Sequence, residues 1–328
     1  MALRAYAGLV RKYGALDFSK IVAERILRRL TGGALSAVFF RRAMKSGVVY
    51  FGEHLGARQG VMRRHFYMYS LACQEIARDR SHRFQVLEVG SYAGASAITW
   101  ALAIRERHDR PGLVICVDPW RNYLSEEDIA GSATPDVLRD MAAALEDGKV
   151  FALFEHNVRA AHLSDIISPL KGRFSEVASS VSPESCDIVY VDANHGYSAV
   201  LSDLHLAAGL TRPGGVLCGD DLEAQWPDLD RDYCESRVMR DLVVDPKSGE
   251  FVHPGVSKAV WDFFGAKVSS WNGFWAMRKT VDGSWAPVTL PAAFSRSQIP
   301  IHLKWWKTKA QAGLLVRPRA KVELSSNG

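Results

Sequence analysis

Two short stretches place polar side chains directly after apolar, strand-like runs. Residues 189–204 read VYVDANHGYSAVLSDL, so that Asp192, Asn194 and His195 follow an apolar run, and residues 213–226 read PGGVLCGDDLEAQW, which ends a second run in Asp220 and Asp221. If these runs are neighbouring parallel strands, about 4.8 Å apart, their carboxyl ends share the ligand-binding edge of the sheet. Bare carboxylates gathered there would repel one another. Asp192, Asp220 and Asp221 therefore predict a site for a hard divalent cation such as Mg²⁺.

Such a cation would lower the pKa of a bound hydroxyl and make it a nucleophile at neutral pH. His195 is the second candidate for this task, because the unperturbed pKa of histidine lies near 6.5 and suits a general base. We expect His195 and Asp192 to be catalytic. The alternative interpretations are ordinary loop acids and a histidine that bonds to the backbone at the start of a helix.

A glycine turn follows an earlier strand-like run, in LEVGSYAGASA. Gly90 and Gly94 would let backbone N–H groups approach a ligand at the start of the next helix. Glu88, at the end of the run, is an unusual acid to find in a strand, and Asp118 ends the next run, where a carboxylate can bind ribose hydroxyls. The spacing differs from that of the GxGxxG fingerprint, which argues against a nicotinamide cofactor.

The elements that carry these residues alternate between short apolar strands and helices. We expect strands at 84–89, 112–117, 149–155, 186–191 and 214–219, a later helix at 255–264, and an antiparallel pair near the end. This order predicts a doubly wound, Rossmann-like, mostly parallel α/β sheet with helices on both faces. A helix is expected over 63–79, and the N-terminal region is expected to be helical from Asp17 to Ser46 with a break at 31–33.

The motifs together resemble those of class I S-adenosylmethionine-dependent methyltransferases, in particular the metal-dependent O-methyltransferases of the catechol and macrocin type. EVGSYAGAS, VDP, VDANHGY and PGGVLCGDD carry the resemblance, which covers about residues 63–280. It implies S-adenosylmethionine as the cofactor. The resemblance further implies cofactor contacts from the following residues: Glu88, Gly90, Gly94, Ser96, Asp118, Trp120 and Asn157. For Trp120, which would stack on adenine, the alternative is a place in the core or in a lid.

The chain departs from the family at one point of the second motif. Relatives commonly read D-G-D-H-x-Y where this chain has Ala193 and Asn194, so an acid is lost there and His195 is the remaining base. Asn194 and Trp226 are expected to contact the acceptor. The alternatives are a metal-independent methyltransferase that uses His195 as its base, and a catalytically inactive module of the same fold.

Composition and charge limit the remaining classes of protein. The 328 residues carry a net charge of +5, and five cysteines are scattered without a CxxC pair, which favours a reducing compartment. Residues 1–46 contain ten Lys or Arg residues and two acidic residues. Residues 296–321 contain seven Lys or Arg residues and no acidic residue. We therefore expect three regions: a basic helical extension (1–62), the methyltransferase domain (63–285) and a basic tail (286–328).

The same features predict location and partners. No apolar run is long enough for a membrane span and no signal peptide is evident, so a cytoplasmic location is expected. The basic termini are typical of segments that contact an anionic membrane surface. The alternatives are a solvated helix face, and a tail that packs over the domain or over a partner subunit. The acceptor is expected to be a small molecule, a sugar or a glycan-like compound, with a homo-oligomer as a further expectation and nucleic acid not expected.

Overall fold

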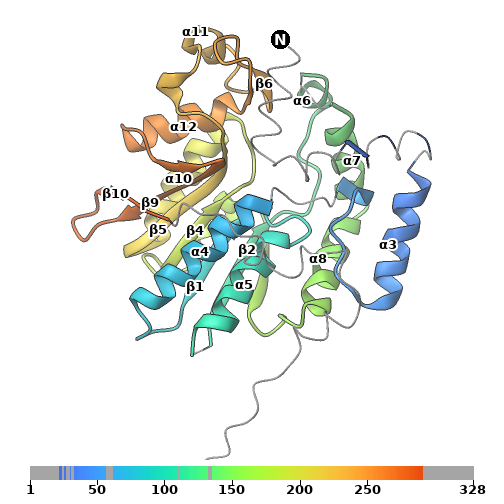
Figure 1. Cartoon of the computed structure of the whole chain (residues 1–328), viewed down its shortest axis with the longest axis horizontal. Coiled ribbons are helices and arrows are strands. Elements are labelled where there is room, and N and C mark those ends of the chain that lie inside the picture. Colours follow the sequence, from blue (N-terminus) through green and yellow to red (C-terminus); the bar gives the residue numbers. More distant parts are fainter. Residues whose placement is uncertain are drawn as a thin grey trace, which may run out of the picture.

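The fold is a mixed α/β sheet covered by helices on both faces, as the sequence predicts (Figure 1). The computed structural model describes residues 33–56, 62–109, 111–131 and 135–290, together with positions 22, 23, 26 and 30. The strands of the main sheet lie in the order β10-β9-β5-β4-β1-β2-β3, and β8 also pairs with β9. Strands β3, β2, β1, β4 and β5 are parallel, whereas β9 runs antiparallel beside β5.

The main strands are β1 (Gln85–Val89), β2 (Leu113–Asp118), β3 (Ile167–Lys171), β4 (Cys186–Val191), β5 (Thr211–Leu222), β8 (Ser269–Trp271), β9 (Gly273–Lys279) and β10 (Trp285–Pro287). A separate small sheet pairs β6 (Val243–Val244) with β7 (Phe251–Val252). The helices include α3 (Ala34–Ser46), α4 (Met62–Arg78), α5 (Ala95–Arg107), α6 (Glu126–Gly131), α7 (Pro135–Glu146), α8 (Lys149–Ala160), α9 (Phe174–Val177), α10 (Tyr197–Leu210), α11 (Arg231–Glu235) and α12 (Pro254–Phe264). Short 3-10 turns are η1 (His54–Gly56), η2 (Ala178–Ser180) and η3 (Trp226–Asp228).

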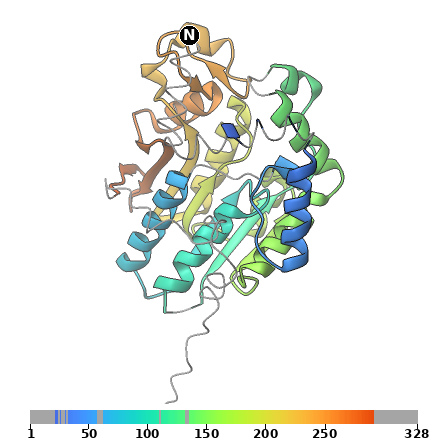
Figure 2. The same cartoon turned by 45° about the vertical axis from the view of Figure 1, so that its right-hand side comes forward.

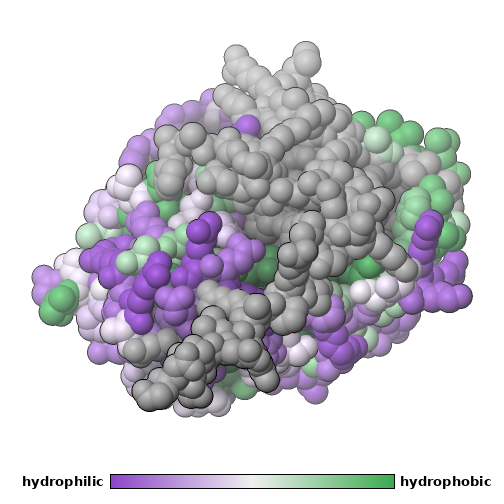
Figure 3. All heavy atoms as spheres, turned by 60° about the horizontal axis from the view of Figure 1, so that its bottom comes forward, coloured by the Kyte–Doolittle hydropathy of each residue, from purple (hydrophilic) through white to green (hydrophobic). Residues whose placement is uncertain are grey.

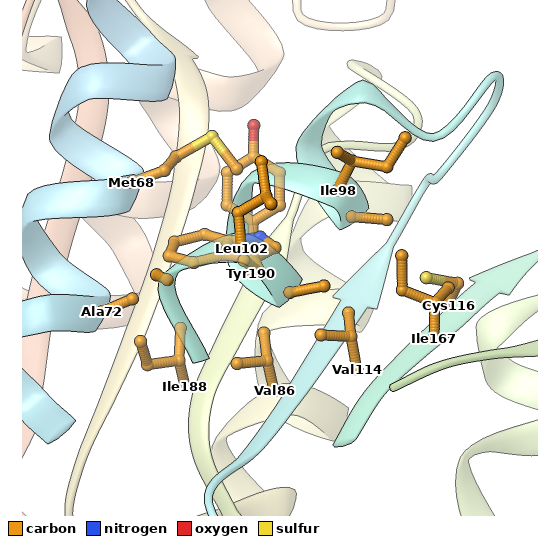
Figure 4. Close-up of a cluster of buried hydrophobic side chains, with 14 of the residues drawn as sticks. Met68, Ala72, Val86, Ile98, Leu102, Val114, Cys116, Ile167, Ile188 and Tyr190 are labelled. Carbon is orange, nitrogen blue, oxygen red and sulfur yellow. The ribbon is translucent and has the colours of Figure 1, made fainter. Parts of the chain in front are cut away.

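Two apolar layers sandwich the sheet because successive strand residues point to opposite faces. On one face, Val86, Ile188 and Tyr190 pack against α4 and α5 (Figure 4). On the other face, Leu87 and Val189 belong to the cluster that includes side chains of α10 and α12. The view in Figure 2 shows the same layers from the side on which α3 lies. Both layers end at the carboxyl edge of the parallel strands, where the chain turns polar.

One predicted strand is wrong. Residues 149–155 form the start of α8, and the third strand is β3 at Ile167–Lys171. The buried residues of α8 (Val150, Leu153, Phe154, Asn157 and Val158) recur every three or four positions, which is the spacing of a helix. β3 is hard to recognise because it lies at the edge of the sheet, contains Pro169 and buries little apolar surface.

Both ends of the chain lie partly outside the described residues. Helix α3 confirms the second half of the expected N-terminal helix, whereas most of residues 17–32 and all of 291–328 are outside the described ranges. β10 crosses the boundary expected at 285/286, so the sheet continues to Pro287. Helix α3 leaves Val38 and Phe39 about half exposed, and apolar surface gathers on the right of Figure 3, the side where α3 lies in Figure 1. Among the described residues, no helix combines the length and the apolar character needed to cross a membrane.

Candidate active site

The glycine turn after β1 touches the end of β4. Gly90 has φ 92°, a backbone conformation that side chains disfavour, and its N–H donates to the Val117 carbonyl at 2.8 Å. A Cβ at Gly90 would lie 2.0 Å from the carbonyl oxygen of Asp192. The Asp192 N–H in turn donates to the Val89 carbonyl at 2.9 Å. The predicted cofactor turn and the predicted acidic edge are therefore adjacent.

Glu88 is a fully buried acid beside this turn. Its Oε1 accepts a hydrogen bond from Ser96 Oγ at 2.9 Å, so both residues lie where the sequence placed them, at the end of β1 and in the first turn of α5. Burial raises the pKa of Glu88 to about 8. A carboxyl group buried to this extent favours a cation at its side, because a positive charge would stabilise the ionised form.

Asp118 organises the same turn from the end of β2. Its Oδ2 accepts from the Tyr92 N–H at 2.9 Å, and its Oδ1 accepts from the Trp120 N–H at 2.6 Å. Burial raises the pKa of Asp118, and the backbone hydrogen bonds oppose this rise. Each carboxylate oxygen has more than one lone pair, so Asp118 retains capacity to bind ligand hydroxyls.

Trp120 lies in the protein core. Its ring is 1% exposed, its Nε1 donates to the Tyr92 carbonyl at 2.8 Å, and its ring centroid lies 4.8 Å from that of Phe151 and 4.9 Å from that of Phe154. Gly94 belongs to the same packing, since a Cβ there would lie 2.9 Å from the Phe154 ring. Trp120 thus packs beneath the glycine turn as part of the core and stabilises it.

Asn157 fastens the segment after α3 to the glycine turn. The residue lies in α8 and not after a strand, because the predicted strand is a helix. Its Oδ1 accepts from the Tyr50 N–H at 2.8 Å, and its Nδ2 donates to the carbonyls of Tyr50 and Ala93 at 3.1 and 2.9 Å. Through these three hydrogen bonds to the backbone, the Asn157 side chain has a structural role.

Asn157→Ala should therefore lower stability more than it lowers cofactor affinity. Because three buried backbone partners lose their hydrogen bonds, we expect a loss of about 2–4 kcal/mol in the free energy of unfolding. Chemical denaturation measures this change, and calorimetry should give a dissociation constant for S-adenosylmethionine within about threefold of the wild type at a temperature where the variant is folded. A large loss of affinity with unchanged stability would instead place Asn157 at the ligand.

At the sheet edge, two carboxylates bind an arginine. Arg64, from the first turn of α4, places its Nη1 2.5 Å from Asp220 Oδ2 and 3.0 Å from Asp192 Oδ2. The Tyr190 hydroxyl also donates to Asp192 Oδ2, at 2.9 Å. Arg64 and Asp220 are almost fully buried. The sequence predicts the meeting of these acids correctly, but it does not reveal that a guanidinium lies between them.

The third carboxylate of the predicted set is turned towards histidines. Asp221 has φ 62° and lies at an irregularity in the pairing of β5 with β9, between Gly219 and Leu222. Its Oδ2 lies 3.1 Å from His195 Nε2, and its Oδ1 lies 3.8 Å from His253 Nδ1. Asp220 and Asp221 therefore bind to different partners: Asp220 pairs with Arg64 of α4, and Asp221 with His195 and with the start of α12.

His195 lies between two carboxylates. Its Nδ1 is 2.6 Å from Asp241 Oδ1, and its Nε2 faces Asp221. Burial by itself would lower the pKa of His195, but the two carboxylates outweigh it and raise the pKa well above the ordinary 6.5. A ring that holds its proton in this way cannot accept another, so these surroundings do not favour the predicted role of His195 as a general base.

The two predicted acceptor contacts lie apart from this cluster. Asn194 is exposed at the end of β4, where its Oδ1 accepts from the Gly196 N–H at 2.7 Å. Trp226 is 6% exposed and packs in a separate apolar cluster with Leu229 and Cys234. In this structure both side chains are engaged in local structure.

Four residues of the site were not predicted: Arg64, Glu223, Asp241 and His253. Arg64 is one of many arginines and lies in a helix far away in sequence. His253 carried a signal, because it precedes Pro254 at the start of α12 in the HPG triplet, and a Cβ at Gly255 would lie 2.3 Å from the carbonyl oxygen of His195. That close approach explains why glycine follows Pro254, and it brings His253 to the sheet edge.

The predicted Mg²⁺ site can be tested against this geometry. Carboxylate oxygens of Asp192, Asp220 and Asp221 all lie within 4.8 Å of one another, which is compact enough for one ion. Arg64 Nη1 binds Oδ2 of Asp192 and of Asp220, and Asp221 Oδ2 faces His195. A divalent ion at the three carboxylates would therefore have to displace the guanidinium or bind beside it, and the Mg²⁺ site stays a prediction.

Comparisons with known proteins find one matching family model. A family model described as a methyltransferase domain matches residues 87–222, which include the glycine turn, Asp118, Asp192 and both acids of β5. No curated protein sequence matches the chain at a significant level.

Solved structures with similar folds have low sequence identity to the chain. NovP, an O-methyltransferase, is 13% identical, with 66% of this chain and 80% of that chain covered and a TM-score of 0.46. An O-methyltransferase from Bacillus cereus in complex with SAH is 16% identical, with 78% and 94% covered and a TM-score of 0.40. A putative O-methyltransferase from Klebsiella pneumoniae is 13% identical, with 71% and 83% covered and a TM-score of 0.41.

The matched segment begins inside β1 and ends with β5, so it contains both the turn and the acidic edge. The sheet outside it adds the antiparallel β9 beside β5. Residues 87–222 of the chain therefore match a methyltransferase domain, and this match includes the glycine turn and the acidic edge.

Proposed function

We propose that the protein transfers a methyl group to a hydroxyl of a sugar, a glycan-like compound or another small hydroxylated acceptor. The observation that carries this proposal is the contact between the glycine turn and the acidic edge, where Gly90 lies against the backbone of Asp192. The acceptor would lie at the carboxyl ends of β4 and β5, beside the cofactor. Orientation of the two reactants is then the main source of rate enhancement.

Different residues of the chain would bind the cofactor and take part in the reaction. S-adenosylmethionine, when bound, supplies the methyl group as a sulfonium. Gly90 and Gly94 shape the turn around it, Glu88 offers a negative charge, and Asp118 accepts hydrogen bonds from ribose hydroxyls. Asp192 is held by Arg64 and Tyr190 at the acceptor side, where its carboxylate can orient the reacting hydroxyl and accept its proton.

Two observations favour a sugar or glycan over a phenolic acceptor. The sequence resembles a branch that includes sugar O-methyltransferases, and both termini carry an excess of basic residues. Basic segments attract anionic lipids and anionic glycans. We propose that the termini bring the domain to such an acceptor at a membrane surface.

The test is a screen with isotopically labelled S-adenosylmethionine against cell-envelope extracts and a panel of catechols, with mass spectrometry to locate the methyl group. Label on an envelope sugar, with incorporation that falls at high salt, supports the proposal. Label confined to catechols would contradict the sugar acceptor, and label on protein or nucleic acid would contradict small-molecule O-methylation. A failure to bind S-adenosylmethionine at all would support the inactive module.

Asp118→Asn supplies the matching binding experiment. The substitution removes the charge that strengthens hydrogen bonds from ribose hydroxyls, so we expect roughly 10- to 100-fold weaker binding of S-adenosylmethionine in calorimetry. Asp165→Asn is the control, because the Asp165 side chain is 71% exposed and pairs with Arg105 at the surface. Equal affinities in the two variants would contradict the cofactor site.

A further inference from the structure

We propose that His195, Asp221 and His253 bind a divalent transition-metal ion, with Zn²⁺ and Co²⁺ as the test ions. The site lies beside Arg64, Asp192 and Asp220, which together are called the Arg64 cluster, and it shares only Asp221 with the three acids predicted from the sequence. The inference does not depend on the acceptor class in the proposed function. It identifies a second ligand class at the same sheet edge.

The three side chains converge although they come from separate segments. One ligand atom from each of His195, Asp221 and His253 lies within 4.8 Å of the others, so a single ion placed among them could reach all three. The two imidazole rings face each other with centroids 4.5 Å apart. His253 is buried, and His195 and Asp221 are partly accessible, which leaves an open side for water or a ligand.

Neighbouring carboxylates orient both rings. Asp241 Oδ1 lies 2.6 Å from His195 Nδ1, an arrangement in which Nδ1 donates and Nε2 is directed at Asp221. Nε2 binds a metal ion only in the neutral ring, so the ion would take the place of the proton that faces Asp221, and binding would release that proton. Metal-binding histidines commonly have such a carboxylate partner, which fixes the ring and increases its basicity. Glu223 lies 3.1 Å from His253 Nδ1, the nitrogen that also faces Asp221, and it accepts the backbone N–H of His253 at 3.2 Å, so it fixes the position of the second ring and offers a further oxygen.

The backbone is built to bring these groups together. Asp221 adopts φ 62°, which is uncommon for a residue with a side chain and costs free energy unless the surroundings compensate. Gly255 allows the start of α12 to approach so closely that a Cβ there would lie 2.3 Å from the carbonyl oxygens of His195 and Val238. The strained aspartate and the close helix start both direct ligand atoms into the same space.

The chemistry of the donors selects the class of ion. Mg²⁺ prefers oxygen ligands, whereas imidazole nitrogens favour Zn²⁺ and other first-row transition metals. Two imidazoles and one carboxylate, with open positions, form a set that such ions bind. The Arg64 cluster offers only carboxylate oxygens, and a guanidinium already binds one oxygen of Asp192 and one of Asp220, so the two groups of side chains differ in both charge and ligand type.

The experiment measures metal binding in the full chain after removal of metal with EDTA. Zn²⁺ affinity is measured by competition with a chromophoric chelator, and Co²⁺ is added separately to record the visible spectrum of a histidine-bound ion. We expect one Zn²⁺ per chain, bound at least 100-fold more tightly than Mg²⁺. His253→Gln should lose at least tenfold in Zn²⁺ affinity and most of the Co²⁺ spectrum.

Two further variants separate ligand loss from misfolding. Asp241→Asn removes an orienting carboxylate without removing a ligand, and a tenfold loss of Zn²⁺ affinity is expected. His205→Gln, on the exposed side of α10, is the matched control and should bind Zn²⁺ like the wild type. Thermal unfolding of each metal-free variant checks the fold.

Three results would overturn the proposal. The first is absence of Zn²⁺ and Co²⁺ binding by the wild type, which would leave a hydrogen-bonded histidine–carboxylate cluster. The second is equal Zn²⁺ affinity in folded His253→Gln and wild-type protein. The third is a loss of binding in Asp192→Asn as large as in His253→Gln, which would assign the ion to the three carboxylates. None of these measurements depends on methyl transfer, so failure here is distinguishable from failure of the proposed function.

Discussion

Glu88→Gln should make the protein more stable above neutral pH and at the same time weaken its binding of S-adenosylmethionine. Glu88 is fully buried, and burial raises its pKa to about 8. In the unfolded chain a glutamate ionises near pH 4.3. Between these two values the folded state holds a proton that the unfolded state releases, so the free energy of unfolding falls as the pH rises from about 4.3 to about 8.

Glutamine at position 88 removes this penalty without removing the local contact. Its side-chain oxygen can still accept the hydrogen bond that Ser96 Oγ donates to Glu88. Each pH unit of the interval corresponds to at most about 1.4 kcal/mol, and we expect a gain of about 2 kcal/mol in the free energy of unfolding at pH 8. At pH 4 the gain should vanish, because both states of the wild type are then protonated.

Cofactor binding should change in the opposite direction. If the positive charge of S-adenosylmethionine stabilises ionised Glu88, its loss removes a charged interaction of about 1.5–3 kcal/mol, which weakens binding roughly 10- to 100-fold. Denaturation curves at pH 4, 6 and 8 and calorimetry at pH 8 measure the two effects. Lower stability of the variant at pH 8, or unchanged affinity, would refute this view of Glu88.

Glu75→Gln is the matched control. Glu75 is also a buried glutamate, but both of its oxygens lie 2.6 Å from nitrogens of Arg278 on β9. Substitution there leaves the arginine with a weaker partner. We expect a loss of stability and an unchanged affinity for S-adenosylmethionine, the reverse of the Glu88 result.

The sequence predicts most of the fold because the central strands are short, apolar and bounded by polar residues. β1, β2, β4 and β5 lie near their expected positions, and so do α4, α5, α10 and α12. The error at 149–155 has a physical cause, since a run with apolar residues at nearly every position fits a buried strand and a buried helix alike. The edge strand β3 has too few buried apolar residues to be recognised.

In the site, the sequence predicts where the acids lie, but the packing of the helices determines which side chains they bind. The meeting of Asp192 with Asp220 and Asp221 follows from the order of β4 and β5, because ends of adjacent parallel strands share an edge. The partners of these acids depend on the approach of α4 and α12, which no local pattern encodes. Asp220 binds Arg64 of α4, whereas Asp221 faces His253 at the start of α12.

Arg64→Met should destabilise the protein strongly in the absence of a divalent ion. The arginine is buried and binds Asp192 and Asp220 through one nitrogen. Removing one side of a buried ion pair leaves uncompensated charge, at a cost of about 3–5 kcal/mol. Chemical denaturation in EDTA measures the loss. A variant as stable as the wild type would show that the two carboxylates do not need this cation.

The same variant tests the Mg²⁺ site predicted from the sequence. Without the guanidinium, oxygens of Asp192, Asp220 and Asp221 lie within 4.8 Å of one another and become available to a hard ion. An ion that binds only the folded state adds stability with concentration, about 2.7 kcal/mol at 100 times its dissociation constant. We therefore expect Mg²⁺ to restore much of the stability of Arg64→Met and to change that of the wild type little.

Arg278→Met separates this effect from a general action of salt. Arg278 also has a buried carboxylate partner, Glu75, so its loss should destabilise the protein to a similar degree. Only one carboxylate is left behind there, and one carboxylate is a poor Mg²⁺ site because the ion retains most of its waters. Restoration by Mg²⁺ confined to Arg64→Met would show that Arg64 takes the place of a metal ion at the acidic edge. Equal stabilisation of the wild type by Mg²⁺ would show instead that the arginine gives way to the ion.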